Sequence, residues 1–123
     1  MPGGLWFLIG MHEVSICESI MDIIREQAAK ERASRVTCVK LKVGEMAGVV
    51  EGAMRFAFEV VSKDTLADGA ELVIDTVPLA ARCNSCGAEF RVSGYAFSCE
   101  NCGGPDIVLV SGRELVVEEL EME

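Results

Sequence analysis

The sequence predicts an α+β fold in which two helices pack on a small three-stranded sheet and a four-cysteine lobe is inserted between strands. Three observations support this prediction. Two segments repeat apolar residues at the helical period, and other segments alternate apolar with polar residues as half-buried strands do. Before the last strand-like segment stand two Cys-x-x-Cys pairs separated by twelve residues, formed by Cys83, Cys86, Cys99 and Cys102.

One helix is expected to follow Ser15 and to carry Lys30, Arg32 and Arg35 late in it, and a second is expected from about Val50 to Lys63. The first should begin at Ser15, because Ser15 and Glu18 have the spacing of a capping box. Its apolar stripe consists of Ile16, Ile20, Ile23, Ile24 and Ala28. The stripe of the second helix consists of Val50, Met54, Ala57, Phe58 and Val61. Each helix therefore has one face available for a shared core.

The three strands of the sheet are expected at residues 39–43, 72–75 and 115–117. In the first, Val39, Leu41 and Val43 alternate with lysines. The second ends before Pro78, which cannot donate to a strand ladder. The third needs a core that the cysteine lobe cannot offer, so it must return to the helices. This gives an N-terminal extension at 1–10, an α/β domain at 11–81 plus 112–123, and a lobe at 82–111.

The first ten residues show no pattern that predicts a structure. Their apolar run, Leu5 to Ile9, is too short for a signal-peptide core or a membrane span, and no lysine or arginine precedes it. We therefore expect a cytoplasmic protein without a membrane partner. Because the extension has no evident role, we also expect translation to begin at Met11.

The cysteine pairs have the spacing of ligands for one metal ion. Zinc takes four thiolates in a tetrahedron, and a glycine after each pair lets the turn fold back toward the sulfurs. In a reducing compartment this favours a structural zinc over disulfides, a redox dithiol or a rubredoxin-like iron site. The apolar side chains of this zinc-ribbon-like lobe are too few to fold it by burial alone. They are Phe90, Val92, Tyr95 and Phe97.

The charge of the chain limits its partners. Its formal net charge is −9 at pH 7, so binding to a nucleic acid backbone is not expected. A cation or a basic protein suits this charge better. Catalysis is also not expected, because the single histidine, His12, has no nucleophile beside it in the sequence and no phosphate-binding glycine loop is present.

His12 is a candidate metal ligand together with its two neighbours. A lone histidine is most often a surface or structural residue, but Met11, His12 and Glu13 stand together just before the predicted helix. If Met11 is the first residue, its amine, the His12 amide nitrogen and imidazole, and a donor from Glu13 supply a nitrogen-rich, nearly square array. Such fields suit nickel(II) or copper(II) rather than zinc.

From Met11 to its end, the chain resembles the HypA/HybF family of hydrogenase nickel incorporation proteins. The cysteine pairs alone fit many unrelated zinc ribbons, whereas the whole set of motifs in this order is specific. Besides the cysteines, it comprises Met11-His12-Glu13-Val14-Ser15, Val43-Gly44-Glu45, Phe56-Ala57-Phe58-Glu59-Val60-Val61, Ala70-Glu71-Leu72 and Ser111-Gly112-Arg113-Glu114-Leu115.

The resemblance implies a nickel metallochaperone and not an enzyme. It implies that His12 binds Ni(II), with Glu13 as a helper and the Met11 amine as a further ligand, and that the four cysteines hold zinc. The implied partners are a HypB-type GTPase, the hydrogenase large subunit and, in some members, urease maturation proteins. The expected oligomeric state is a monomer or a homodimer. In the family this methionine is the first residue, whereas here ten residues precede it.

Two other functions are compatible with parts of the sequence. A zinc-ribbon scaffold would bind proteins without delivering nickel, and it would not need His12. A thiol oxidoreductase would use one Cys-x-x-Cys pair, but the glycines after both pairs favour metal binding instead.

Overall fold

The computed structural model describes residues 3–94 and 96–123, with side chains from His12 onward. The chain divides into two units. The larger comprises Met1–Leu41, Val49–Ile74 and Val117–Glu123, and the smaller comprises Lys42–Gly48 and Asp75–Val116. Each unit is described by itself below.

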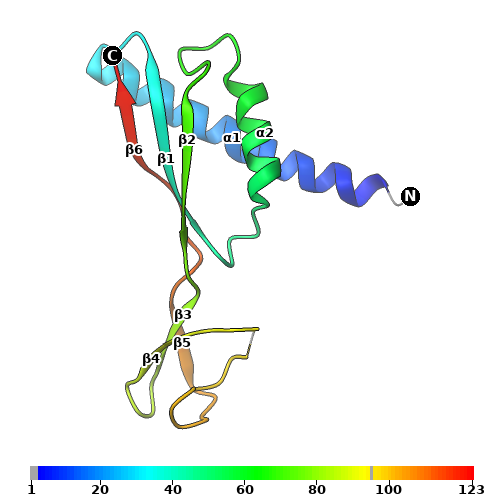
Figure 1. The fold of residues 1–123 in the computed structure, drawn as a ribbon, viewed down its shortest axis with the longest axis vertical. Coiled ribbons are helices and arrows are strands. Elements are labelled where there is room, and N and C mark those ends of the chain that lie inside the picture. The colour runs from blue at the N-terminus through cyan, green and yellow to red at the C-terminus, as the bar shows by residue number, and fades with distance from the viewer. Residues whose placement is uncertain (1–2, 95) are drawn as a thin grey trace. The chain divides into compact units, whose positions relative to one another are not determined.

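The predicted layer of two helices and three strands is confirmed (Figure 1). The helices are α1 (Gly3–Glu31) and α2 (Glu51–Ser62), and the strands are β1 (Val36–Gly44), β2 (Glu71–Val77) and β6 (Leu115–Met122). The strands form a sheet in the order β2-β1-β6, so β1 is central and β6 is an edge. The strand that closes the chain thus returns beside the first strand, as predicted.

The predicted start of the first helix is wrong. α1 begins at Gly3, so Ser15 lies inside it, and the Ser19 hydroxyl donates to the Ser15 carbonyl at 3.2 Å. No proline interrupts the helix between Gly3 and Glu31, and each interior residue adds a backbone hydrogen bond. These backbone hydrogen bonds let the helix continue through Ser15 in spite of the local capping signal. Met1 and Pro2 lie outside the described residues.

The core of the larger unit lies between the two helices and β1. Its fully buried side chains include Cys17, Met21, Ile24, Val39, Leu41 and Met54, each at most 1% exposed. The Cys17 thiol approaches Met54 Sδ at 3.5 Å, which joins α1 to α2. Two side chains of the predicted stripes lie outside this core, because Ile23 is 41% and Val50 is 54% exposed.

The cysteine lobe contains a second sheet that the sequence did not predict in full. Its strands are β3 (Ala80–Cys83), β4 (Glu89–Arg91) and β5 (Ile107–Ser111), in the order β4-β3-β5. Of the three, only β5 is indicated by the sequence, where Ile107 to Val110 is strand-like. All three stand between β2 and β6 in the chain, which agrees with an insertion (Figure 1).

The core of this second sheet is small and differs from the predicted one. Its buried members are Leu79, Ala81 and Val92, with Phe90 partly buried against them. Phe97 is 42% exposed, so it adds little apolar burial. Tyr95, also expected here, lies outside the described residues.

Two of the family motifs meet in the smaller unit at a close crossing of backbones. The Gly44 amide donates to the Glu114 carbonyl at 2.7 Å, and the Met46 amide donates to the Gly112 carbonyl at 2.7 Å. A Cβ on Gly44 would stand 2.1 Å from the Gly112 carbonyl carbon, and one on Gly112 would stand 2.6 Å from Leu79 Cα. Both glycines are therefore required by packing.

Gly112→Ala is expected to destabilise the smaller unit by on the order of 2 to 5 kcal/mol, because it combines steric overlap with a φ of 109°. Urea unfolding followed by NMR signals of this unit measures the effect. The matched control is Gly52→Ala, where nothing lies within 4 Å of the new Cβ. The control should be neutral or stabilising by up to about 1 kcal/mol. Equal stability of both variants would contradict the tight crossing.

Candidate metal centres

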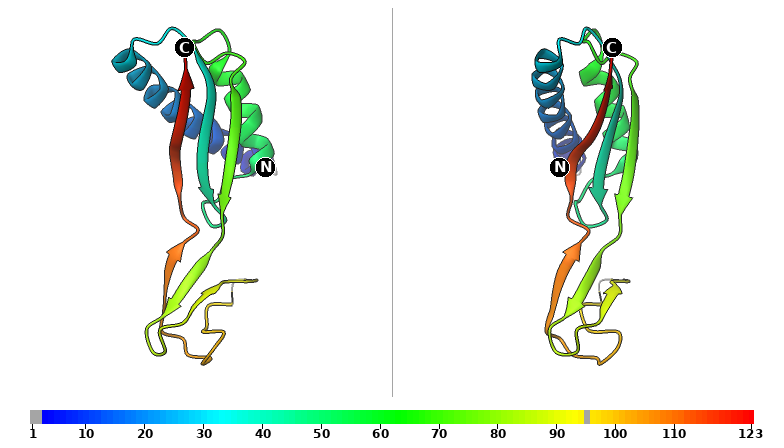
Figure 2. Two further views of the ribbon diagram at one scale, coloured as in Figure 1. Left: turned by 60° about the vertical axis from the view of Figure 1, so that its left-hand side comes forward. Right: turned by 90° about the vertical axis from the view of Figure 1, so that its left-hand side faces the viewer.

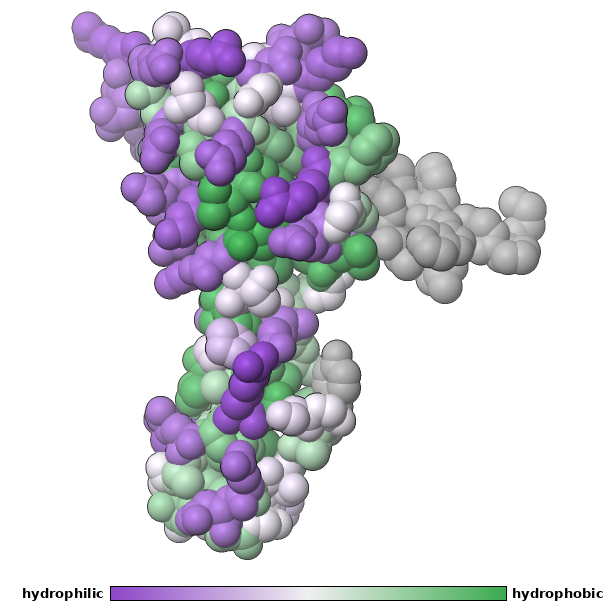
Figure 3. Space-filling view, in the orientation of Figure 1, coloured by the Kyte–Doolittle hydropathy of each residue, from purple (hydrophilic) through white to green (hydrophobic). Residues whose placement is uncertain are grey.

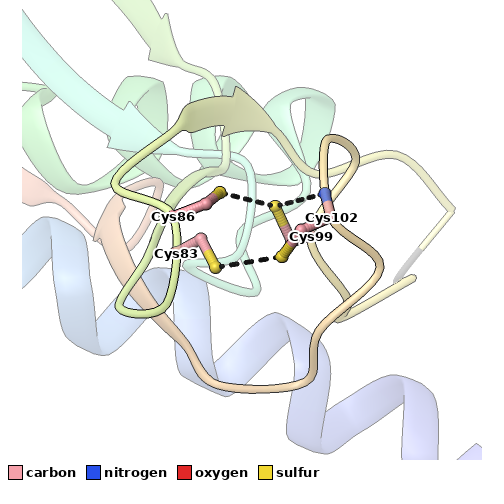
Figure 4. Close-up of side chains that lie close together, drawn as sticks. All are labelled: Cys83, Cys86, Cys99 and Cys102. Atoms are coloured by element: carbon pink, nitrogen blue, oxygen red, sulfur yellow. Dashed lines mark hydrogen bonds between the residues drawn. The ribbon is translucent and has the colours of Figure 1, made fainter.

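The four cysteines converge on one point in the smaller unit (Figure 4). Cys83 ends β3 and Cys86 follows in the next turn, whereas Cys99 and Cys102 lie in the loop before β5. All four Sγ atoms lie within 4.8 Å of one another. The Sγ atoms of Cys83 and Cys102 are 3.7 Å apart, and those of Cys86 and Cys99 are 3.6 Å apart.

These distances fit a tetrahedral zinc site. With Zn–S bonds of about 2.3 Å, the edge of the sulfur tetrahedron is about 3.8 Å. They do not fit disulfides, whose sulfur atoms lie about 2.05 Å apart, and all six cysteines are free. The donor set of four soft thiolates, with no carboxylate in the cluster, is typical of a closed structural zinc site.

The two cysteine turns have the same backbone form, as the glycines in the sequence predicted. The amide of Gly87 donates to the Cys83 carbonyl at 2.9 Å, and the amide of Gly103 donates to the Cys99 carbonyl at 2.8 Å. Both glycines have φ near +75°, at 76° and 73°. A left-handed residue here folds each turn back toward its own pair of sulfurs.

Hydrogen-bond donors around the sulfurs favour the charged thiolate. The backbone N–H of Ala88, followed by the Asn101 side chain, lowers the pKa of the Cys86 thiol from 9.0 to about 6. The Asn101 amide nitrogen stands 3.6 Å from Cys86 Sγ. The pKa of Cys83 is also lowered, chiefly by the backbone N–H of Cys86. The backbone N–H of Gly104 lowers the pKa of Cys102, but the neighbouring Cys83 and Cys99 side chains raise it to about 11. Since only thiolates bind metal well, the donors at Cys83 and Cys86 prepare these two sulfurs for a cation.

The second candidate centre, at His12 and Glu13, lies within α1 and not in exposed chain before it, which corrects the sequence interpretation. The two side chains have opposite environments. His12 is exposed, whereas Glu13 is only 1% exposed. Met11 belongs to the same helix, and its side chain is outside the described set.

Glu13 connects the two helices of the larger unit. Its Oε1 accepts a hydrogen bond of 3.2 Å from the amide of Val50, the residue that precedes α2. A carboxylate at the N-terminus of a helix also meets the positive end of the helix dipole. Oε2 is buried and has no hydrogen-bond partner among the described residues. Burial, with a smaller contribution from the Glu13 charge, raises the pKa of the Cys17 thiol to about 11.

Sequence reasoning missed this bond from Glu13 to Val50. Cys17, placed one turn after Glu13, is a small core residue, and a pKa of about 11 keeps its thiol protonated. The spacing of Glu13, Cys17 and Met21 at intervals of four is the signal that could have placed Glu13 on the buried face.

Among the described residues, no helix has both the length and the apolar character needed to cross a lipid bilayer.

Comparison with known proteins supports the family resemblance. The family model for "Hydrogenase/urease nickel incorporation, metallochaperone, hypA" matches residues 11–122. The hydrogenase maturation factor HypA of Geobacter metallireducens is 46% identical over 113 residues, which are 92% of this chain and 100% of that protein. The hydrogenase maturation factor HybF of Klebsiella pneumoniae is 42% identical over the same shares of the two chains.

Two solved structures have the same fold. The solution structure of the Ni metallochaperone HypA from Helicobacter pylori has a TM-score of 0.65 and 25% identity, covering 89% of this chain and 96% of that one. A second HypA solution structure has a TM-score of 0.70 and 26% identity, covering 92% and 97%. With the four-cysteine centre and the match from Met11 onward, these findings establish that the chain belongs to the HypA family of nickel-incorporation metallochaperones.

Proposed function

We propose that this protein binds Ni(II) and assists its insertion into the large subunit of [NiFe]-hydrogenase. The observation that carries the proposal is the exposed His12 at the start of the family match, in the unit that does not hold the cysteine centre. A cargo ion must be released, and an exposed imidazole permits ligand exchange that a closed set of four thiolates resists. The partners in this proposal are a HypB-type GTPase, the hydrogenase large subunit and, for urease, its maturation proteins.

In this proposal nickel binds at His12 with help from Met11 and Glu13. The helix geometry gives a physical reason for the role of Met11. Amides inside a helix are committed to carbonyls four residues earlier, so a chain that continues back to Gly3 occupies the His12 amide. If the chain begins at Met11, the first four N–H groups of the helix have no intrahelical acceptor. The Met11 amine and the His12 amide nitrogen are then available beside the imidazole.

Glu13 supports this site from within the core. One of its oxygens holds the Val50 amide, which fixes the turn of α1 that carries His12 against the start of α2. The other oxygen is buried and has no partner among the described residues, so it remains a possible acceptor inside the core. The helper role of Glu13 is thus chiefly to position the helix turn.

Cys83, Cys86, Cys99 and Cys102 hold a structural zinc in this proposal. The zinc-binding lobe is residues 82–111, and nickel is bound by the domain formed by residues 11–81 and 112–123. The fit of the sulfur distances to a zinc tetrahedron supports this division of roles. The zinc stabilises the lobe and is not the cargo.

Nickel titration of three forms of the chain tests the ligand set. A form that begins at Met11 is expected to bind Ni(II) at least about tenfold more tightly than one that begins at Met1, because loss even of a supporting group commonly costs tenfold or more in affinity. A third form, with Met11 acetylated, removes only the amine and should bind like the longer chain. Equal affinity of the three zinc-loaded forms in calorimetry would refute the amine as a ligand.

A further inference from the structure

The C-terminal part of β6 forms an open edge of the larger unit. On one side it pairs with β1, and just beyond the two strands the Glu123 amide donates to the Arg35 carbonyl at 2.8 Å and the Ser34 amide donates to the Glu123 carbonyl at 2.9 Å. On the other side, no described strand pairs with it (Figure 2). Backbone donors and acceptors on such an edge can pair with an added strand.

A groove of about 650 Å³ runs along this edge, between β6 and the C-terminal half of α1. Residues 117–120 and 122 of β6 line it, together with Glu123 just after the strand, so residues from both faces of β6 border the groove. Ile23, a residue of the predicted stripe that lies outside the core, lines the opposite wall and is 41% exposed. Leu120 and Met122 add apolar surface from β6. The groove can therefore receive both a backbone and apolar side chains.

The charge of the groove is strongly negative. Its lining includes one arginine, Arg32, and four glutamates, which are Glu31, Glu118, Glu119 and Glu123. Figure 3 shows hydrophilic residues gathered along the margin of the larger unit over β6. The pKa of Cys38 on β1 is raised, first by burial and then by the charges of Glu121, Glu71 and Glu119. Of these three glutamates, only Glu119 lines the groove.

This charge pattern selects among the possible occupants of the edge. A second copy of the chain, paired edge to edge, would place glutamates against glutamates, and like charges across a strand pair are destabilising. A strand with lysine or arginine at alternate positions would instead meet opposite charges. Its remaining side chains would face the apolar residues of the groove.

We propose that the groove between α1 and β6 binds an extended basic segment of a partner protein, which adds to the β6 edge as a further strand. Main-chain hydrogen bonds to β6 would give affinity, and the alternation of basic and apolar side chains would give specificity. The proposal goes beyond nickel binding and does not rest on it, since none of these residues belongs to either metal centre.

A synthetic eight-residue peptide of alternating lysine and valine tests the proposal, with the zinc-loaded full chain observed by two-dimensional NMR. We expect amide shifts concentrated in residues 117–123 and in the C-terminal half of α1. A peptide with glutamate in place of lysine should not bind. A peptide with proline in place of two valines keeps the charge but loses backbone donors, so it should bind at least about tenfold more weakly.

Charge reversal of one residue on each wall, Glu31→Lys with Glu119→Lys, should also weaken binding of the lysine–valine peptide at least about tenfold. The matched control, Glu18→Lys with Glu59→Lys, changes the net charge equally at exposed sites outside the groove and should leave binding within about twofold. Equal loss in both double variants, or equal binding of the proline peptide, would show non-specific charge attraction and overturn the proposal. A dimer through β6, detected as a doubled mass in sedimentation, would also overturn the proposal.

Discussion

Removing the metal from the four cysteines is expected to unfold the β4-β3-β5 sheet and to leave the layer of α1, α2 and β1 folded. A strong chelator and a Cys83→Ser, Cys86→Ser double variant should have the same effect. In NMR spectra, the dispersed amide signals of residues 80–111 should collapse, whereas those of the larger unit should persist. Zinc content measured on the same sample relates the collapse to metal loss.

The size of this effect follows from how little else stabilises the second sheet. Among the described residues, and apart from the cysteines, its buried apolar side chains are Leu79, Ala81 and Val92. Full burial of a large aliphatic side chain contributes about 1.5 to 3 kcal/mol, whereas zinc binding in small zinc modules contributes about 10 to 16 kcal/mol. Zinc binding therefore stabilises this sheet more than the burial of its apolar side chains does.

The matched control for this experiment is Cys38→Ser, which alters a thiol on β1 outside the cluster. That variant should retain zinc and the signals of the second sheet. If the sheet of the metal-free chain kept its dispersed signals, the cysteines would be dispensable for folding. The structural role assigned to zinc would then be wrong.

A His12→Ala variant is expected to lose nickel affinity by at least about 100-fold while it retains zinc. The imidazole is the one strong nitrogen donor among the side chains of the proposed site, and removal of a ligand should exceed the 10- to 100-fold loss typical of a supporting residue. His12 is exposed, so its truncation leaves no buried cavity and should change stability by less than about 0.5 kcal/mol. Calorimetric titration with Ni(II) and thermal unfolding measure the two quantities.

Ser15→Ala is the control for the loss at His12, because Ser15 is exposed on the same helix. It should bind nickel like the parent chain. Unchanged nickel affinity in His12→Ala would remove the delivery function proposed above and would favour the alternative of a zinc-ribbon scaffold.

The sequence predicted the parts of the fold that depend on regular periodicity. Alternation in β1 and β2 and the stripe of α2 placed these elements to within a few residues. The start of α1 was misplaced, because a capping box is a local signal and the helix continues through it. β3 and β4 were missed, since strands of four and three residues are too short to show a period.

The candidate sites were predictable to different degrees. Cysteine spacing determined the sulfur cluster completely, because two residues between ligands restrict where the thiolates can meet. The burial of Glu13 could not be read from Met11-His12-Glu13 alone, because it depends on contact with Val50, 37 residues later. The motif residues Gly44 and Gly112 likewise have a role only once their backbones cross.

X-ray absorption at the nickel and zinc edges, on one sample of the chain loaded with both metals, tests the central claim of two separate centres most directly. We expect zinc bound by four sulfurs at about 2.3 Å, and nickel bound by nitrogen and oxygen ligands with imidazole scattering and no sulfur. Nickel–sulfur bonds that form as zinc–sulfur bonds disappear would contradict this claim, because nickel would then occupy the cysteine centre.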